Sequence, residues 1–265
     1  MSTLSISELE AFICDGLAVV DDLVPFYVID QASKSFDDLY AGTNPTGIIE
    51  QPTGAGIEAL YQHPDLERAA KVILQADAVD LVHSAALHTM PADGEWSYST
   101  DTEHVDIQFN EDDWLGAPRR ILFTFMIFMD DVTPNRAPTV VRPGSHLQIA
   151  RQWGSEPAYQ DHPVWMNDLP ALDYADPVPV VGRKGQVAIS STAIVHAGSR
   201  NVSDRPRKML FVYFAPRGLN LRFNIDREDR RVSFLRGLAD RFDPDRGHIV
   251  KHAAKALAEI AAGSS

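Results

Sequence analysis

Residues 193–214, AIVHAGSRNVSDRPRKMLFVYF, contain two runs that are typical of β-strands. Ala193–Val195 is short and apolar, and Lys208–Phe214 is rich in β-branched and aromatic residues. Gly, Ser, Asn, Asp and Pro fill the segment between the two runs, as they do in loops. The stretch therefore predicts two strands joined by a polar loop, the building unit of an antiparallel β-fold.

Similar short runs recur through the middle of the chain, separated by turn residues such as Pro143-Gly144. The further predicted strands are Val79–Met90, Asp101–Phe109, Ile121–Met129, Thr139–Val141, Val178–Val181 and Gln186–Ile189. Seven or eight strands at this density favour a sandwich or a barrel-like jelly roll over a βαβ array.

The flanking parts of the chain are predicted to be mainly helical, with one short strand at Leu17–Val20. Apolar residues at helical spacing indicate helices over Ser5–Cys14, Tyr27–Leu39, Pro64–Ala76 and Ile249–Ala262. We therefore expect one mainly β domain over residues 1–265. It comprises a helical part at about 1–78, a β core at about 79–216 and a C-terminal helical extension at about 217–265.

Composition narrows the classes of partner. The net charge is −13, from 24 Lys and Arg against 37 Asp and Glu, so nucleic acids and anionic membranes are disfavoured. No apolar run reaches the roughly 18 residues of a membrane span, and the N-terminus does not resemble a signal peptide. The single cysteine, Cys14, cannot form an intramolecular disulfide. We expect a cytoplasmic protein with a small-molecule partner and an unknown oligomeric state.

Two histidines and one acid form the candidate metal site. His104 and Asp106 lie two residues apart, so on an extended chain their side chains point to the same side. His196 follows a predicted strand far downstream and must be brought back by the fold. Two histidines and one carboxylate bind Fe(II) on one face and leave the opposite positions open. The His-x-Asp pair alone is weak evidence in a chain with 9 histidines.

Arg207 adds a carboxylate-binding group to this set, because the arginine fork makes two parallel charge-assisted bonds to a carboxylate. On an extended chain Arg207 shares a face with Met209, Phe211 and Tyr213, whereas Lys208 points away. Arg205 has the same parity but precedes Pro206 in the predicted loop. We therefore prefer Arg207 over Arg205 as the residue that binds a carboxylate-bearing co-substrate.

Other histidines are weaker metal ligands. His146 follows a Pro-Gly-Ser turn and is interpreted as structural. His83 and His88 fall on opposite faces of a predicted strand, so they cannot chelate together. His248 and His252 have helical i, i+4 spacing, which permits joint metal binding, although no acidic motif accompanies them. Motifs for a serine nucleophile, a phosphate-binding loop or a dinucleotide are missing from the sequence.

Four blocks of sequence resemble one enzyme family. They are Ile6–Phe12 with Asp15-Gly16-Leu17, His104-Val105-Asp106, Arg142–His146 and His196–Arg207. Over about Ser5–Pro216 the chain is similar to the phytanoyl-CoA dioxygenase family of Fe(II)- and 2-oxoglutarate-dependent oxygenases. The resemblance implies a double-stranded β-helix, a cupin-like jelly roll. It also implies an Fe(II) site of His104, Asp106 and His196, with O2 and with the distal carboxylate of 2-oxoglutarate on Arg207.

The sequence departs from the family pattern at several positions. Arg136-Ala137 replaces the usual Asn-Gly, the usual His-Gly-Ser is His196-Ala197-Gly198-Ser199, and Met126 replaces a common tryptophan. These departures affect secondary co-substrate contacts and leave the metal triad intact. Because Asp106 fills the carboxylate position, halogenation is disfavoured.

The leading hypothesis is a dioxygenase that oxidises, by default hydroxylates, an unactivated C–H of a small-molecule metabolite and releases succinate and CO2. Desaturation, ring closure and epimerisation share the same start. The alternative is a non-catalytic metal-binding β-barrel that binds or senses a small molecule, but such a protein does not need Arg207. A hydrolase lacks a general base, since Glu103 is predicted to face away from the triad.

Aromatic residues in loops supply the candidates for substrate binding, namely Trp96, Tyr98 and Trp153. Trp153 begins a long aperiodic segment, Gln152–Pro177, that also carries Tyr159 and Trp165. Oxidation at iron requires exclusion of water, so we expect this segment to be a lid over the metal. The alternative is an ordinary surface excursion whose aromatic side chains pack on the outside of the barrel.

Overall fold

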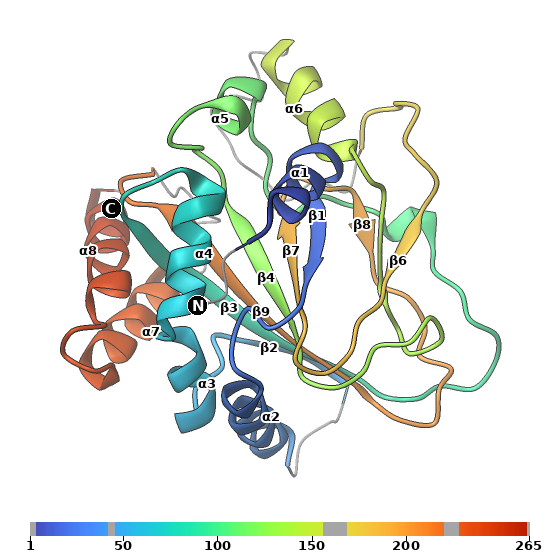
Figure 1. Ribbon diagram of the computed structural model, residues 1–265, viewed down its shortest axis with the longest axis horizontal. Helices are drawn as coiled ribbons and strands as arrows, with labels where there is room; N and C mark the ends of the chain where they lie inside the picture. Colours follow the sequence, from blue (N-terminus) through green and yellow to red (C-terminus); the bar gives the residue numbers. More distant parts are fainter. Residues whose placement is uncertain (1–3, 42–45, 156–168, 220–227, 264–265) are drawn as a thin grey trace.

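The computed structural model describes residues 4–41, 46–155, 169–219 and 228–263, and its centre is two antiparallel sheets (Figure 1). The larger sheet has the order β1-β7-β4-β9-β3-β2 and the smaller has the order β6-β5-β8. The strands are β1 Leu17–Val20, β2 Gly47–Glu50, β3 Val79–Thr89, β4 Phe123–Phe128, β5 Thr139–Val141, β6 Val178–Val180, β7 Val187–Ser191, β8 His196–Ala197 and β9 Arg207–Pro216. This confirms the predicted jelly-roll core with flanking helices.

The helices lie mostly on the face of the large sheet that is turned away from the small sheet (Figure 1). They are α1 Ile6–Asp15, α2 Phe26–Tyr40, α3 Ala55–Tyr61, α4 Pro64–Leu74, α5 Glu111–Leu115, α6 Ser145–Ser155, α7 Glu228–Arg241 and α8 His248–Gly263, with a 3₁₀ turn at Thr100–Thr102. One apolar core joins α2, α3, α4, α7 and α8 to the sheet.

The central strand β4 is buried on both sides, which explains its unbroken apolar sequence. Phe125 and Ile127 belong to the core shared with the helices, whereas Met126 and Phe128 pack against residues of the small sheet. Strand β9 alternates in the same way, with Leu210 toward the helices and Met209 toward the small sheet. The space between the two sheets is therefore reached by every second residue of these strands.

The predicted helices near both ends are present, and their end signals explain them. Ser5 and Glu8 form a capping box at the start of α1, and Gly16 ends it with a φ of 76°. Pro64 occupies the first turn of α4. Among the described residues no helix is long and apolar enough to cross a membrane.

Two strand predictions are wrong. Asp101–Phe109 is irregular apart from a single bridge at His104, because Ser99 caps the 3₁₀ turn and Asn110 caps α5, so local capping replaces strand pairing. Ala193–Val195 is a turn after β7, in which the Ile194 amide donates to the Ser191 carbonyl, and the strand starts only at His196.

The sequence interpretation also missed β2, α3, α5, α6 and α7. Most of these elements are short, so their periodicity is weak. Half of the predicted lid at Gln152–Pro177 lies outside the described residues, because positions 156–168 are not among them.

Candidate metal centre

His104, Asp106 and His196 meet at one point between the sheets. The Nε2 atoms of His104 and His196 each lie 3.7 Å from Oδ1 of Asp106, and the two ring centroids are 4.3 Å apart. Throughout the part of the chain that the structure describes, this is the one group of three or more His, Cys, Asp or Glu side chains with metal-binding geometry. Facial ligands about 2.1 Å from one ion lie roughly 3 Å apart, so ion binding requires small side-chain movements.

Backbone hydrogen bonds assemble the triad. The backbones of His104 and His196 exchange two hydrogen bonds, with N–O distances of 3.0 and 2.9 Å, which places the two rings side by side. The Asp106 amide donates to the Thr192 carbonyl at 2.9 Å and thereby fixes the acid beside them. His196 is therefore brought back to His104 by an isolated bridge and not by a regular strand.

Each imidazole ring is oriented by a contact between its Nδ1 atom and a backbone carbonyl, and the two ring planes are inclined by 51°. Nδ1 of His104 lies 2.8 Å from the Thr102 carbonyl, and Nδ1 of His196 lies 2.9 Å from the Ile194 carbonyl. A carbonyl oxygen can only accept, so each Nδ1 carries the hydrogen and each Nε2 presents a lone pair. This is the tautomer that a metal-binding histidine requires. Burial and the neighbouring His196 lower the pKa of His104, which favours the neutral ring.

Asp106 has polar neighbours on the large sheet. The hydroxyl group of Tyr213 makes side-chain hydrogen bonds with Thr124 and Asp106, and the Tyr213 ring lies 5.2 Å from the ring of His83. Burial and the charge of Asp106 raise the pKa of Tyr213 well above its ordinary value, so the hydroxyl keeps its proton. Sequence alternation predicts that Tyr213 shares a face with Arg207, but the sequence interpretation did not place it beside Asp106.

Arg207 is a buried cation at the start of β9, with 2% of its surface exposed. Its NH1 group donates to the Ala137 carbonyl at 2.6 Å and lies 3.4 Å from Oγ1 of Thr139, while Nε has no hydrogen-bond partner. Burial lowers its pKa to about 10, which leaves the group charged at neutral pH. Among the described residues no carboxylate pairs with it, so its charge and free donor fit an anionic ligand.

The profile of the phytanoyl-CoA dioxygenase (PhyH) family matches residues 12–209. The chain belongs to this family. A similar protein, ectoine dioxygenase from Sphingopyxis alaskensis, is 23% identical, with 80% of this chain and 76% of that protein covered. The family match runs from α1 to the start of β9, so it includes the triad and Arg207.

Solved structures show the same fold. The epimerase SnoN from nogalamycin biosynthesis, in complex with Fe3+, 2-oxoglutarate and nogalamycin RO, superposes with a TM-score of 0.61 at 18% identity, covering 80% of this chain and 83% of that one. EctD from S. alaskensis with 2-oxoglutarate and 5-hydroxyectoine gives a TM-score of 0.56 at 16% identity, covering 82% and 78%. This chain is a 2-oxoglutarate-dependent non-haem iron dioxygenase that uses iron, 2-oxoglutarate and O2.

His146, His248 and His252 of this dioxygenase have structural partners. His146 is buried, its Nε2 lies 3.1 Å from the Ile13 carbonyl and its ring packs on Trp114; burial lowers its pKa to about 4. His248 pairs with Glu67 at 3.0 Å and His252 pairs with Asp80 at 2.9 Å, so each has its own acid. Glu103 pairs with Arg142 at 2.8 Å, which accounts for its charge without a role as a general base.

Two of the three residues predicted to bind substrate, Trp96 and Tyr98, have described side chains. Trp96 and Tyr98 contact each other with ring centroids 6.2 Å apart, and Tyr98 forms a bridge with Ser199, close to His196. Their role in substrate binding stays a prediction. The side chain of Trp153 lies outside the described residues, as do Tyr159 and Trp165.

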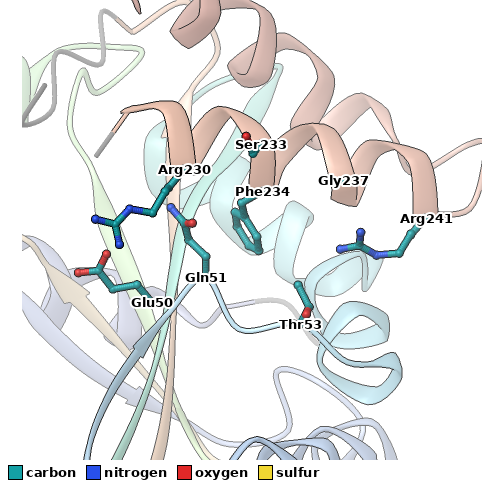
Figure 2. Close-up of a pocket in the computed structure, with 8 residues that line it drawn as sticks. All are labelled: Glu50, Gln51, Thr53, Arg230, Ser233, Phe234, Gly237 and Arg241. Carbon is teal, nitrogen blue, oxygen red and sulfur yellow. The ribbon is translucent and has the colours of Figure 1, made fainter. Parts of the chain in front are cut away.

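A separate hollow of about 470 Å³ lies between the end of β2 and α7 (Figure 2). Its lining residues are Glu50, Gln51, Thr53, Arg230, Ser233, Phe234, Gly237 and Arg241. None of the predicted site residues belongs to it, and Arg241 already pairs with Glu58 at 3.0 Å. The hollow is therefore distinct from the candidate metal centre.

Proposed function

We propose that His104, Asp106 and His196 bind the Fe(II) of this dioxygenase and that Arg207 binds the distal carboxylate of 2-oxoglutarate. The enzyme hydroxylates an unactivated C–H of a small-molecule metabolite, within a single domain over residues 1–265. The observation that carries the proposal is the pair of imidazoles whose Nδ1 atoms are tied to backbone carbonyls and whose Nε2 atoms converge on Asp106.

Iron bound at this triad supplies, with 2-oxoglutarate and O2, the oxidant for the C–H bond, and succinate and CO2 are released. The residues of the chain provide the environment for that chemistry. Two neutral imidazoles and one carboxylate leave the ion with a net positive charge. The buried Arg207 selects a 2-oxo acid with a second carboxylate, because its guanidinium loses its water contacts and gains no acid from the residues that the structure describes.

Hydroxylation is preferred over the other outcomes on the basis of the relatives. Ectoine dioxygenase and the EctD structure with 5-hydroxyectoine point to hydroxylation, whereas SnoN is an epimerase and SnoK is a carbocyclase. All of these proteins share the fold, so the fold alone does not determine the outcome. A small, free metabolite fits the same set of relatives better than a macromolecular substrate.

The experiment that tests the iron site is an anaerobic Fe(II) titration of His104→Ala, His196→Ala and the wild type, followed by an assay of succinate release. Each triad variant should lose iron binding and succinate release while keeping the wild-type circular dichroism spectrum. His252→Gln is the matched control, because that histidine pairs with Asp80, and it should bind iron normally. Wild-type affinity for iron in both triad variants would refute the assignment.

A screen of candidate small molecules with Fe(II), 2-oxoglutarate and ascorbate then identifies the substrate by stimulated succinate release. The product is analysed by mass spectrometry, and hydroxylation adds one oxygen atom. A product that has lost two hydrogens would indicate desaturation or ring closure instead of hydroxylation. A product of unchanged mass would indicate epimerisation.

A further inference from the structure

We propose that Arg136 is a positioning residue that sets the orientation of Arg207 for the co-substrate. The inference rests on the proposed role of Arg207 and extends it to a residue that does not touch the ligand. Arg136 is 4% exposed and lies on the loop between β4 and β5. Together with Ala137 it forms one of the departures from the family pattern described above.

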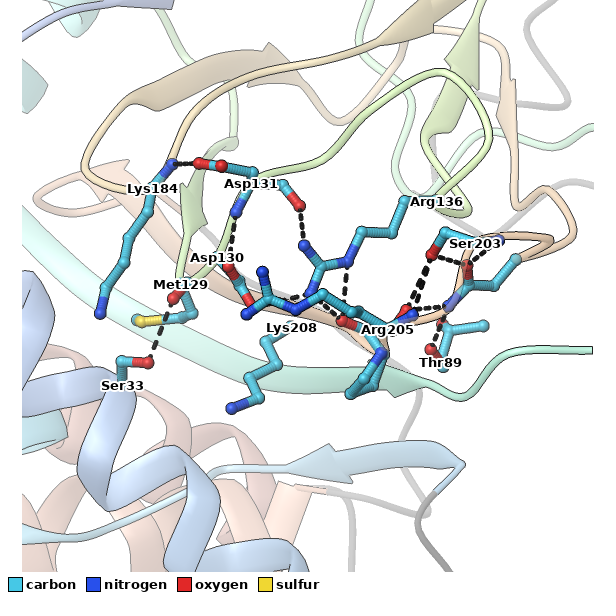
Figure 3. Close-up of polar contacts among 12 residues, drawn as sticks. Ser33, Thr89, Met129, Asp130, Asp131, Arg136, Lys184, Ser203, Arg205 and Lys208 are labelled. Atoms are coloured by element: carbon cyan, nitrogen blue, oxygen red, sulfur yellow. Dashed lines mark hydrogen bonds and ion pairs between the residues drawn. The ribbon is translucent and has the colours of Figure 1, made fainter.

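The Arg136 guanidinium is bound on all sides (Figure 3). Nε donates to the Pro206 carbonyl at 2.9 Å, and NH2 donates to the same carbonyl and to Oδ2 of Asp130 at 2.7 Å. NH1 donates to the Asp131 carbonyl at 2.7 Å. Two nitrogens of the rigid, planar guanidinium therefore bind the Pro206 carbonyl oxygen, while Asp130 and the Asp131 carbonyl fix the guanidinium itself.

The Pro206 carbonyl oxygen belongs to the peptide group that contains the backbone nitrogen of Arg207. Because a peptide group is planar and rigid, fixing the Pro206 oxygen also fixes the nitrogen and Cα of Arg207. The side chain of Arg207 is held by Ala137, the residue after Arg136, because NH1 of Arg207 donates to the Ala137 carbonyl at 2.6 Å. The dipeptide Arg136-Ala137 thus holds both the backbone and the side chain of Arg207.

The loop before Arg207 is anchored from its other side by Asn201. Its Nδ2 group donates to the Arg205 carbonyl at 2.8 Å and to the Thr89 carbonyl at 2.9 Å, and its backbone forms a bridge with Arg136. Ala137 has a φ of 47°, a left-handed conformation that is unusual for alanine and that directs its carbonyl at Arg207. The loop before Arg207 is therefore fixed. This fixes the plane of the Arg207 guanidinium, which a bidentate contact with a carboxylate requires.

The test compares Arg136→Gln with the wild type for two ligands of the iron-loaded protein, titrated without oxygen. 2-Oxoglutarate carries the distal carboxylate that reaches Arg207, whereas pyruvate carries the same 2-oxo acid group without it. Arg136→Gln should weaken 2-oxoglutarate binding roughly 10-fold, the scale of coupling between contacting residues, and leave pyruvate binding unchanged. Equal weakening of both acids, or unchanged binding of 2-oxoglutarate, would overturn the inference.

Arg205→Gln is the matched control. Arg205 also reaches Oδ2 of Asp130, at 3.5 Å, but its side chain is 63% exposed. Its removal should leave both affinities unchanged. If Arg136→Gln does not fold, Asp130→Asn loosens the same guanidinium more gently, and it should weaken 2-oxoglutarate alone by a smaller factor. If Arg205→Gln weakened 2-oxoglutarate binding as much as Arg136→Gln does, the cause would be a general charge effect and the positioning role would be rejected.

A double mutant separates this inference from the proposed function. If Arg136 acts through Arg207, Arg136→Gln should have no further effect on 2-oxoglutarate binding in the Arg207→Ala background. An Arg207→Ala variant with wild-type affinity for 2-oxoglutarate would refute the proposed function itself. A weakened Arg207→Ala beside an unaffected Arg136→Gln would refute only the positioning role.

Discussion

Glu67 and Arg207 are both charged and buried, yet the chain treats them in opposite ways. Glu67, on α4, is 6% exposed and bonded by Lys71 at 2.9 Å, Arg246 at 2.7 Å and His248 at 3.0 Å. Arg207, at the start of β9, is 2% exposed and has no acid beside it among the described residues. Glu67 joins α4 to α8 and the turn before it, whereas Arg207 faces the small sheet.

The difference in partners indicates different roles: the charge of Glu67 stabilises the fold, and the charge of Arg207 is available to a ligand. Burial alone would raise the pKa of Glu67, but hydrogen bonds from Lys71, His248 and Arg246 outweigh it and lower the pKa to about 2. Burial without an acidic partner instead lowers the pKa of Arg207 to about 10. An unpaired buried charge costs stability, so its partner is expected to come from outside the chain.

The largest effect is expected from Glu67→Gln. This change removes the carboxylate that Lys71, Arg246 and His248 contact, so the free energy of unfolding should fall by about 3 kcal/mol, the scale for breaking a buried ion pair. Urea unfolding at pH 7 measures it, and 2-oxoglutarate affinity should not change. Glu259→Gln removes an acid from an exposed pair with Lys255 and should cost less than about 0.5 kcal/mol. If the wild type, Glu67→Gln and Glu259→Gln had the same free energy of unfolding, Glu67 would not be a charge that stabilises the fold.

The same carboxylate predicts acid sensitivity of a definite sign. Its pKa is about 2 in the folded protein against an ordinary value of 4.5, so its contribution is present above pH 4.5 and is lost as the pH falls toward 2. The free-energy difference between wild type and Glu67→Gln should therefore narrow across this window. Unfolding curves at several pH values test it, and a difference that stays constant would contradict the ion-pair account.

Arg207→Lys should weaken 2-oxoglutarate binding by roughly 1.5–3 kcal/mol, the scale of a charge-assisted hydrogen bond. This corresponds to about 10- to 150-fold in Kd. Lysine keeps the charge but cannot make the bidentate contact, and an anaerobic titration of the iron-loaded protein measures the change.

Arg207→Met sharpens the contrast with Glu67. Replacing an unpaired buried cation by an apolar side chain should leave the stability of the ligand-free protein unchanged or raised. The variant should also lose the stabilisation that 2-oxoglutarate gives the wild type. A loss of stability as large as that of Glu67→Gln would show that Arg207 serves the fold.

The smallest effect is expected from Arg205→Ala. Arg205 has the same parity as Arg207, but its exposed side chain reaches only Asp130, at 3.5 Å. We expect a change in the free energy of unfolding below about 0.5 kcal/mol and an unchanged affinity for 2-oxoglutarate. A damaging Arg205→Ala together with a silent Arg207→Ala would reverse the assignment.

Regular elements were predictable where local signals and periodicity agree. The apolar spacing over Ser5–Cys14 predicted the first helix, and the alternation along β9 predicted the face that Arg207 occupies. The His-x-Asp pair was predicted to share a side because it was placed on a strand. The structure brings the two side chains together through a single bridge and capped turns, so they lie side by side although the predicted strand is wrong.

The contacts that complete the site were beyond sequence reasoning because they depend on the tertiary fold. The carbonyls of Thr102 and Ile194 orient the two imidazoles, and any residue type can supply a carbonyl. Arg136 lies far from Arg207 in sequence, and its two bonds to the Pro206 oxygen follow from how the β4–β5 loop crosses the start of β9. Neither contact leaves a pattern in the sequence.

The pairing of β1 has a consequence for synthesis of the chain. Leu17 lies opposite Ser190 and Val20 opposite Val187, so the first strand pairs with one made much later. At about 5–20 residues per second, the ribosome needs roughly 10–30 s to reach β7 after it has made β1. During that interval the apolar strand LAVV has none of its native pairing partners. Helix α1, which contacts β1 in the folded protein, is made just before it and is available to cover the strand during that interval.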